Sequence, residues 1–459
     1  MKKGFCLLLC VLIGLACACR EPVLPTFESS ESAITSSVPA STAAESQPSA
    51  SVPEGSSDDN STVTPLTEEE APETEEEPAN VPAVPDLPEP AGFSGFTYPD
   101  RTREEIDQAY AFTGFHYLPI LTEAPDGFYL STVTLRRQCY LDKATGDTVV
   151  FCGDPVCSHK TPDCAAFYAG VPKWYGGKLY YYVNYDRIQT FLMNPDGSDR
   201  REITHFVRES PVQGSLSNAA TCICGNYGYG RIRLGVNDDG YGIEAISRSR
   251  MEAGAPEEIL FTCEYEDWPE AYILSLFGDE KAVWFSTVRY RENAETGRFE
   301  SASDIYRYDT ATGELTSPWR FDHMVGSFFV FDDELWYCPN QQEGETPQIR
   351  RVRQDGTDEC VIKGDGGMMS CDGVFVYVAS AENSGIRIYS LEGVLLANVT
   401  PTHLQHWSAD TSEHCLYFYE EVSDNDQATL TVEIYDKADI VNGITDHPLV
   451  SGITVTFGD

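Results

Sequence analysis

From residue 96 to residue 459, hydrophobic positions occur in short runs of β-branched and aromatic residues separated by Gly, Asp and Asn. Runs of this length between turn-forming residues are typical of β-strands. One kind of run is rich in Tyr, Phe, Val and Leu and often follows an Asp/Gly turn. It occurs seven times, starting at Gly127, Lys178, Tyr227, Lys281, Glu334, Gly373 and His414. The pattern predicts seven strands of one repeated kind.

A second unit consists of an apolar strand, a tight turn that contains glycine, and another strand. Asp-Gly or Thr-Gly between two extended runs indicates a hairpin, because glycine readily adopts the positive φ that tight turns need. This unit also occurs seven times and alternates with the first. Its turn glycines are Gly146, Gly197, Gly254, Gly313, Gly356, Gly393 and Gly443. The folded part of the chain is therefore an internal repeat.

The spacing of the repeat indicates how the units assemble. Successive units start about 40 to 55 residues apart, which matches one four-stranded blade of a β-propeller. About 364 residues divided by seven give about 52 residues per blade. We therefore predict an all-β fold, a seven-bladed β-propeller, over residues 96–459. Stacked β-sandwich domains are the alternative, and the absence of linkers between the units disfavours them.

Two smaller features complete the prediction for the propeller. Only residues 102–111 (TREEIDQAYA) have the pattern of a short helix. The ring is expected to close by means of a completing strand, which is either Ile453–Phe457 or Gly114–Ile120.

The N-terminus has the pattern of a targeting segment. Lys2 and Lys3 precede an apolar run of about a dozen residues, Phe5–Ala16, which is too short to span a bilayer as a stable helix. The predicted targeting segment ends in Leu-Ala-Cys-Ala-Cys. This ending resembles a bacterial lipoprotein lipobox, in which a cysteine is diacylated before cleavage. Cys17 and Cys19 both fit this pattern. We predict a lipoprotein signal peptide over residues 1–19, with an ordinary secretory signal as the alternative.

Residues 20–95 have the composition of a disordered tether. They are rich in Ser, Thr, Pro, Ala and Glu and contain 16 acidic residues and one basic residue. Such a segment cannot bury enough apolar surface to offset the entropy lost on ordering. Two runs of three glutamates repel each other and extend the chain. We expect a spacer that holds the folded domain away from a membrane, although a segment without a length requirement would look the same.

Charge narrows the possible partners. The formal net charge is −42, from 73 acidic and 31 basic side chains. Nucleic-acid binding needs clustered Lys and Arg for phosphate contacts, so nucleic acid is not an expected partner. Adsorption to anionic lipid is disfavoured for the same reason. The predicted contact with the membrane is therefore the N-terminal lipid anchor alone.

The chain has 15 cysteines and eight histidines. Three of these cysteines and one of these histidines occur close together in one short stretch, namely Cys152, Cys157, His159 and Cys164. In the predicted repeat this stretch connects the first blade to the second, which begins near Trp174. Three thiols and one imidazole are suitable ligands for tetrahedral Zn²⁺, but the spacing C-x4-C-x-H-x4-C is not that of a common zinc finger. A disulfide between Cys157 and Cys164 would form in an oxidising compartment, and we favour it over zinc. Reduced, packed thiols are the third possibility, and all three imply a structural role.

The repeat resembles the tyrosine-rich propellers of bacterial surface lipoproteins, which are similar in pattern to YWTD propellers of the low-density-lipoprotein-receptor type and to TolB-like repeats. The stretch with Cys152, Pro155, Cys157, His159 and Cys164 resembles a loop of these lipoproteins. Repeated Gly-His and Trp-Asp pairs of the WD40 type are not found, and neither is the Asp box of sialidases. The resemblance implies a propeller fold and an extracytoplasmic interaction role.

These observations lead to two hypotheses about function. The first is a non-catalytic binding module, lipid-anchored on the extracytoplasmic face of the cell membrane, whose ligand is a protein, peptide or glycan. The second is an extracellular carbohydrate-active hydrolase or lyase with its site at the central channel. No nucleophile elbow, phosphate loop or dinucleotide fingerprint occurs in the sequence, so we name no catalytic and no cofactor-binding residue. Convergent carboxylates with perturbed pKa values would favour the enzyme, and an aromatic patch would favour the binding module.

Overall fold

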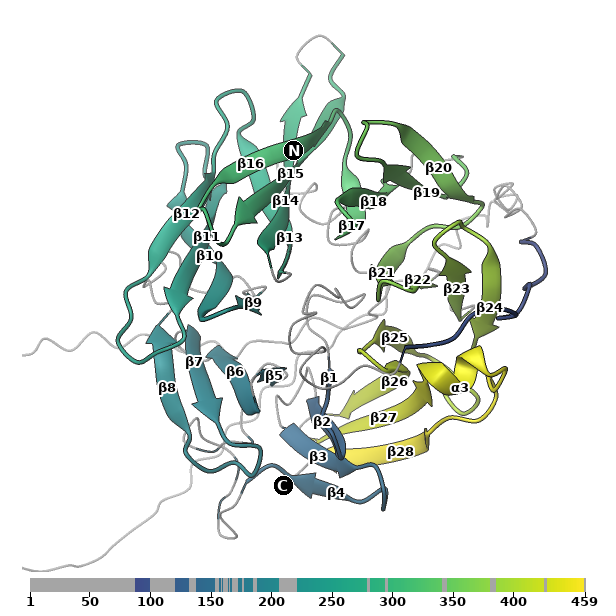
Figure 1. Ribbon diagram of the computed structural model, residues 1–459. Helices are drawn as coiled ribbons and strands as arrows, with labels where there is room; N and C mark the ends of the chain where they lie inside the picture. Colours follow the sequence, from purple (N-terminus) through teal and green to yellow (C-terminus); the bar gives the residue numbers. More distant parts are fainter. Residues whose placement is uncertain are drawn as a thin grey trace, which may run out of the picture. The chain divides into compact units, whose positions relative to one another are not determined.

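The computed structural model describes residues 87–99, 120–131, 138–152, 157, 159, 164, 166, 172–175, 177–184, 188–205, 221–278, 281–293, 296–340, 345–379, 385–424 and 427–457. All of them belong to one compact unit, Ala83–Asp459. Within these residues, 28 strands form seven four-stranded antiparallel sheets, which are arranged as blades around a ring (Figure 1). The predicted all-β, seven-bladed propeller is confirmed. The predicted signal peptide, most of the tether and the predicted helix lie outside the described residues.

Each blade consists of four strands that are consecutive in the sequence, and the first strand lies nearest the centre of the ring (Figure 1). The innermost strands are β1 (Leu121–Glu123), β5 (Lys173–Tyr175), β9 (Thr221–Cys224), β13 (Glu270–Gly278), β17 (Val325–Phe331), β21 (Met368–Cys371) and β25 (Ser408–Thr411). The second strands are β2 (Gly127–Ser131), β6 (Lys178–Asn184), β10 (Tyr227–Val236), β14 (Ala282–Glu292), β18 (Glu334–Pro339), β22 (Phe375–Ala379) and β26 (Cys415–Asp424).

In the first six blades, the two outer strands form the hairpins that the glycine turns predicted. The third strands are β3 (Gln138–Asp142), β7 (Ile188–Met193), β11 (Gly242–Arg250), β15 (Phe299–Asp309), β19 (Gln348–Val352), β23 (Ile386–Ser390) and β27 (Gln427–Asp436). The outermost strands are β4 (Thr148–Val150), β8 (Arg201–His205), β12 (Glu258–Cys263), β16 (Leu315–Phe321), β20 (Asp358–Lys363), β24 (Leu395–Val399) and β28 (Val450–Phe457).

Both predicted units are found in the blades. The tyrosine-rich runs are the second strands, and the seven predicted turn glycines all have positive φ, between 73° and 86°. The seventh blade differs from the predicted tight hairpin, because the short helix α3 (Lys437–Val441) lies between β27 and β28. Asp436 caps α3 through its side chain, which accepts hydrogen bonds from the backbone N–H groups of Ala438 and Asp439. Gly443 therefore follows a helix rather than closing a hairpin.

The order of the strands defines two faces of the ring. Each outermost strand ends, and each next innermost strand starts, at the same face of the ring, which we call the connection face. Each innermost strand starts at this face and ends at the opposite one, where a turn leads into the second strand. We call the opposite face the turn face. The four residues of the Cys/His cluster follow β4 and precede β5, so they are at the connection face.

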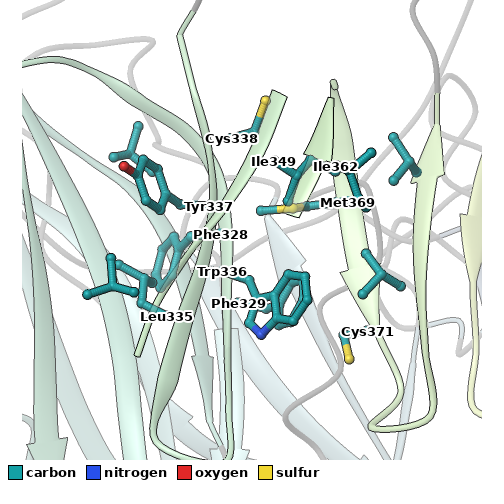
Figure 2. Packing of buried hydrophobic residues seen from close by; sticks show 14 of the residues in the cluster. Phe328, Phe329, Leu335, Trp336, Tyr337, Cys338, Ile349, Ile362, Met369 and Cys371 are labelled. Atoms are coloured by element: carbon teal, nitrogen blue, oxygen red, sulfur yellow. The ribbon is translucent and has the colours of Figure 1, made fainter. Parts of the chain in front are cut away.

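The core lies between neighbouring blades, because each sheet buries both of its faces against the next. Figure 2 shows part of the largest cluster, in which side chains of β17, β18 and β19 meet Met369 and Cys371 of the following blade. Phe329 and Trp336 are register partners on β17 and β18 and stack with a ring-centroid distance of 5.6 Å. Single blades could not bury these residues, which explains why the repeat closes into a ring.

One of the two predicted ways of closing the ring is wrong. The predicted completing strand, Ile453–Phe457, belongs to β28, which pairs with β27 of its own blade. Residues 114–119 lie outside the described residues. Among the described strands, none from one end of the chain pairs into the blade of the other end. Side chains close the ring instead, because apolar residues of β1–β3 and of β26–β28 share one buried cluster.

The segment before the ring packs against the sixth blade. The backbone N–H groups of Ala91 and Gly92 donate hydrogen bonds of 2.9 and 3.0 Å to carbonyls of β24. Phe93 and Tyr98 then pack on Phe375, with ring-centroid distances of 5.6 and 6.4 Å. The chain thus reaches the turn face at the sixth blade. Over the described part of the chain, no helix is both long and apolar enough to cross a bilayer.

Candidate metal centre

The structure brings together all four residues of the predicted Cys/His cluster. The donor atoms of Cys152, Cys157, His159 and Cys164 all lie within 4.8 Å of one another. The Nδ1 atom of His159 is 3.3 Å from the Sγ atom of Cys164, and the backbone N–H of His159 donates a hydrogen bond of 3.4 Å to the Sγ atom of Cys157. The imidazole and the thiols therefore point toward a common centre.

The backbone of His159 has an unusual conformation, which accompanies the convergence of the four donor atoms. Its φ is +54°, in the left-handed region that residues other than glycine rarely occupy. Such a conformation costs roughly 1–3 kcal/mol and persists only where the surroundings impose it. Here it accompanies an imidazole directed at Cys164. The left-handed backbone at His159 therefore helps to direct its imidazole toward the other donors.

The cluster is anchored in the core between the first two blades. Cys164 and Ala166 are buried with Tyr129, Trp174 and Leu179, whereas Cys152, Cys157 and His159 are half-buried at the edge. The backbone N–H of Ala166 donates a hydrogen bond of 3.3 Å to the Sγ atom of Cys164. Burial raises the pKa of the Cys164 thiol to about 12. The neighbouring thiols of Cys157 and Cys152 contribute to this rise, and a thiol with so high a pKa loses its proton at neutral pH only to a strong partner such as a metal ion.

The dimensions of the cluster match a metal tetrahedron. With Zn–S bonds of about 2.3 Å, sulfur atoms of an ideal tetrahedral site lie about 3.8 Å apart. Donor atoms that are all within 4.8 Å need only small side-chain adjustments to reach this separation. The donor set of three cysteines and one histidine is one of the usual sets of structural zinc sites. The cluster could therefore hold a metal ion.

Eleven cysteines lie within the described residues, and eight of them are buried. The buried ones include Cys139 and Cys263, which lie within the blades. The predicted alternative of a Cys157–Cys164 disulfide needs a sulfur–sulfur distance of about 2.05 Å and stays a prediction. Cys17 and Cys19, the predicted lipidation sites, lie outside the described residues, so lipidation also stays a prediction.

Two buried ionic clusters were not predicted from the sequence. Glu123 at the end of β1 bonds to Lys143 and to His414 of the seventh blade. Asp372 pairs with Lys437 at 3.1 Å, and both side chains are almost fully buried. The hydroxyl of Tyr98 completes this second cluster, 3.1 Å from Asp372. Local sequence patterns could not reveal these two clusters, because their charged members are up to 291 residues apart.

A cluster of aromatic and arginine side chains lies on the connection face between the third and fourth blades. It consists of Tyr265, Trp268, Arg289 and Arg291, and we call it the Trp268 patch. The guanidinium of Arg291 lies 4.4 Å from the Trp268 ring centroid, and that of Arg289 lies 4.8 Å from the Tyr265 ring centroid. Arg289 is held by two hydrogen bonds to Asp304, of 2.5 and 3.2 Å. Tyr265 and Trp268 are half-buried, and Arg291 is exposed.

No protein-family model and no curated protein matches the sequence. Solved structures with a similar fold include an acylaminoacyl peptidase from Pyrococcus horikoshii, with 12% identity over 58% of this chain and a TM-score of 0.38. TolB from Acinetobacter baumannii has 13% identity over 69% of this chain and 76% of its own, with a TM-score of 0.34. The β-propeller domain of the Trilobed protease from Pyrococcus furiosus has 12% identity, covers 59% of this chain and 94% of its own, and has a TM-score of 0.30. The chain spans only 44% of the acylaminoacyl peptidase, and these likenesses concern the fold alone.

Proposed function

We propose that this chain is a lipid-anchored, extracytoplasmic β-propeller that acts as a non-catalytic binding module for a protein, peptide or glycan. The observation that carries the binding role is the Trp268 patch on the connection face. Tryptophan, tyrosine and arginine are the residues that most often dominate binding energy at protein surfaces, and tryptophan faces also bind cationic groups. This patch combines two half-buried aromatic rings with two guanidinium groups, which are paired with Asp304 and Glu300.

The lipid anchor rests on the sequence of residues 1–19 and on the acidic tether that follows. Two acyl chains on Cys17 or Cys19 provide stable membrane attachment, whereas one is marginal. Replacing both cysteines with serine should move the protein from the membrane fraction to the soluble fraction. Retention of the double variant in the membrane fraction would contradict the anchor.

A binding experiment tests the module directly. The protein is screened on glycan and peptide arrays, and the products are analysed by mass spectrometry in parallel. A ligand found on the array should bind at least about tenfold more weakly to Trp268→Ala, because removing a central aromatic anchor costs about 2 kcal/mol or more. Trp407→Ala is the matched control, since Trp407 lies on the same face between the sixth and seventh blades. Equal loss in both variants would remove the Trp268 patch as the binding site.

The alternative, a carbohydrate-active hydrolase or lyase, would need a pair of cooperating carboxylates. Each buried carboxylate in the described chain already accepts a bond from a backbone or side-chain donor, and these groups are Glu123, Glu244, Asp304, Asp365, Asp372, Asp410 and Glu433. Burial raises the pKa of Glu244 and of Asp365, but Glu244 lies in the third blade and Asp365 between the fifth and sixth. These positions do not favour an acid–base pair. Cleaved product on the arrays would support the enzyme and refute the binding module.

In this proposal the Cys/His centre is a structural zinc site. Four protein donors complete a tetrahedron and leave no open position for water or substrate, in contrast to catalytic zinc sites with three protein ligands. Metal analysis of the purified protein should give one zinc per chain. A mass two units below that of the fully reduced chain, without metal, would indicate the disulfide instead.

A further inference from the structure

We infer that zinc at the Cys/His centre controls the local order of the junction between the first two blades, so that its removal loosens this junction while the rest of the ring stays folded. The inference rests on the proposed zinc occupancy of the centre. It concerns a part of the connection face that is separate from the Trp268 patch.

The centre is linked to the first blade through a short chain of hydrogen bonds. The Sγ atom of Cys164 accepts a bond from the backbone N–H of Ala166. The carbonyl of Ala166 then accepts a bond of 2.9 Å from the backbone N–H of Gln138, the first residue of β3. A ligand sulfur is therefore connected, through Ala166, to the residue that starts the third strand.

The other end of the same segment is held at the same place. The backbone N–H of Phe151, next to Cys152, donates a bond of 3.1 Å to the carbonyl of Gln138. Both ends of the Cys/His segment thus bond to the two polar backbone groups of one residue. The ring of Phe151 packs edge-to-face on Tyr129 of β2, with a centroid distance of 5.3 Å.

The outer edge of the first blade depends on these contacts. β4 has three residues, all of them exposed, and it pairs with β3 over only three positions. So short a strand with no buried side chain contributes little stability of its own. Its C-terminal end leads directly into Phe151 and Cys152. Loss of the metal removes the centre that holds these residues, and β4 then has only its own few bonds.

Distant blades have no such dependence on the metal. The cluster of Trp336, Met369 and their neighbours contains residues of the fourth, fifth and sixth blades and none of the first two. The Cys/His centre belongs to a separate cluster, which is formed by the first two blades. Because stability in such a repeat is carried by contacts between neighbours, a local loss stays local.

The experiment measures amide hydrogen exchange of the full chain with zinc bound, after removal of zinc with a chelator, and after zinc is added back. We expect exchange at Gln138, Phe151 and Ala166 to become at least about tenfold faster without zinc and to recover with zinc. Exchange in β18 of the fifth blade should change less than about twofold. Cobalt added to the metal-free protein should give the absorption bands of a tetrahedral cobalt–thiolate site.

Two variants make the test specific. His159→Asn removes the imidazole but keeps a residue that tolerates the left-handed backbone, so it should reproduce the metal-free exchange pattern in the presence of zinc. Cys360→Ser is the matched control, because Cys360 is an exposed cysteine of β20, far along the ring from the centre. It should bind zinc and exchange as the unmodified chain does.

The outcomes separate this inference from the proposed function. Bound zinc whose removal leaves the three amides unchanged would overturn the local control, and so would equal acceleration in all seven blades. A metal-free chain with a disulfide would overturn zinc occupancy itself. Neither result would affect binding at the Trp268 patch, which is measured independently.

Discussion

Glu123 makes a polar contact between the two ends of the ring, and replacing it by glutamine tests how the ring closes. One carboxylate oxygen accepts hydrogen bonds of 3.1 Å from the backbone N–H of His414 and from the hydroxyl of Ser412. The other oxygen lies 3.2 Å from the Nζ atom of Lys143 and 3.1 Å from the Nδ1 atom of His414. Glu123→Gln keeps the size of the side chain but removes its charge.

The lowered pKa of Glu123 gives the size of the expected loss of stability. Burial by itself raises this pKa, but the hydrogen bond from His414 and the charge of Lys143 outweigh burial and lower it from 4.5 to about 2. At about 1.4 kcal/mol per pH unit, this corresponds to a preference of about 3 kcal/mol for the ionised form in the folded protein. We therefore expect Glu123→Gln to lower the free energy of unfolding by about 2–3 kcal/mol at pH 6.

The pH dependence has a definite sign. Because the folded pKa of Glu123 is below its unfolded value, its contribution is complete above about pH 4.5 and is lost as the pH falls toward 2. His414 acts in the opposite sense, since its hydrogen bond to Glu123 raises its pKa. The contribution of His414 is complete below about pH 6.5 and is lost as the pH rises through the raised folded value. The contact is thus strongest between about pH 5 and 6.

Denaturant unfolding of the full chain between pH 3 and pH 8, followed by tryptophan fluorescence, measures both effects. Hydrogen exchange in β1 and β26 provides a local readout of ring closure. Glu300→Gln is the matched control, because Glu300 pairs with Arg291 on the surface of the fourth blade. If Glu123→Gln were no more destabilising than Glu300→Gln, or kept the acid dependence of the unmodified chain, the role of Glu123 in ring closure would be refuted.

Three further predictions follow from the packing. Deleting residues 29–86 should leave the melting temperature unchanged, whereas deleting residues 29–98 should lower it, because the latter removes the aromatic contacts with the sixth blade; equal melting of both would contradict this docking. Lys437→Met should lower the free energy of unfolding by about 3–5 kcal/mol in chemical denaturation, since it leaves a buried carboxylate without its cation. Gly393→Ala should be more destabilising than Gly356→Ala by roughly 1–3 kcal/mol. Both glycines have positive φ, but only at Gly393 would a Cβ atom overlap a backbone carbonyl of the neighbouring blade, and similar melting temperatures would rule out this overlap.

The sequence alone predicted the repeat because its signals are local. A tyrosine-rich second strand and a glycine turn recur within each blade, and both depend on residues close together in the chain. Seven such units without linkers lead to a ring of seven blades. The helix α3 in the last blade was missed, because Asp436 and Gly443 mark a helix start and end as well as they mark a turn.

The innermost strands were much harder to recognise. β1 and β5 have three residues each and β9 has four, which is too short for a hydrophobic period to show. Their strand conformation comes from pairing with the second strand of the blade. Closure of the ring was likewise not predictable, because packing between the first and last blades decides it.

The candidate metal centre depends both on the local sequence and on the tertiary structure. Its four donors lie within thirteen residues, so the sequence by itself determined the cluster, just as it determined the number of blades. Only the tertiary structure decided that the donor atoms converge, because burial of Cys164 between two blades and the left-handed backbone at His159 direct them to one point. It also decided the contact of Glu123 with His414, 291 residues away, which no local pattern records. Short-range signals in a chain determine elements and repeats, whereas contacts between distant residues form only when the ring closes.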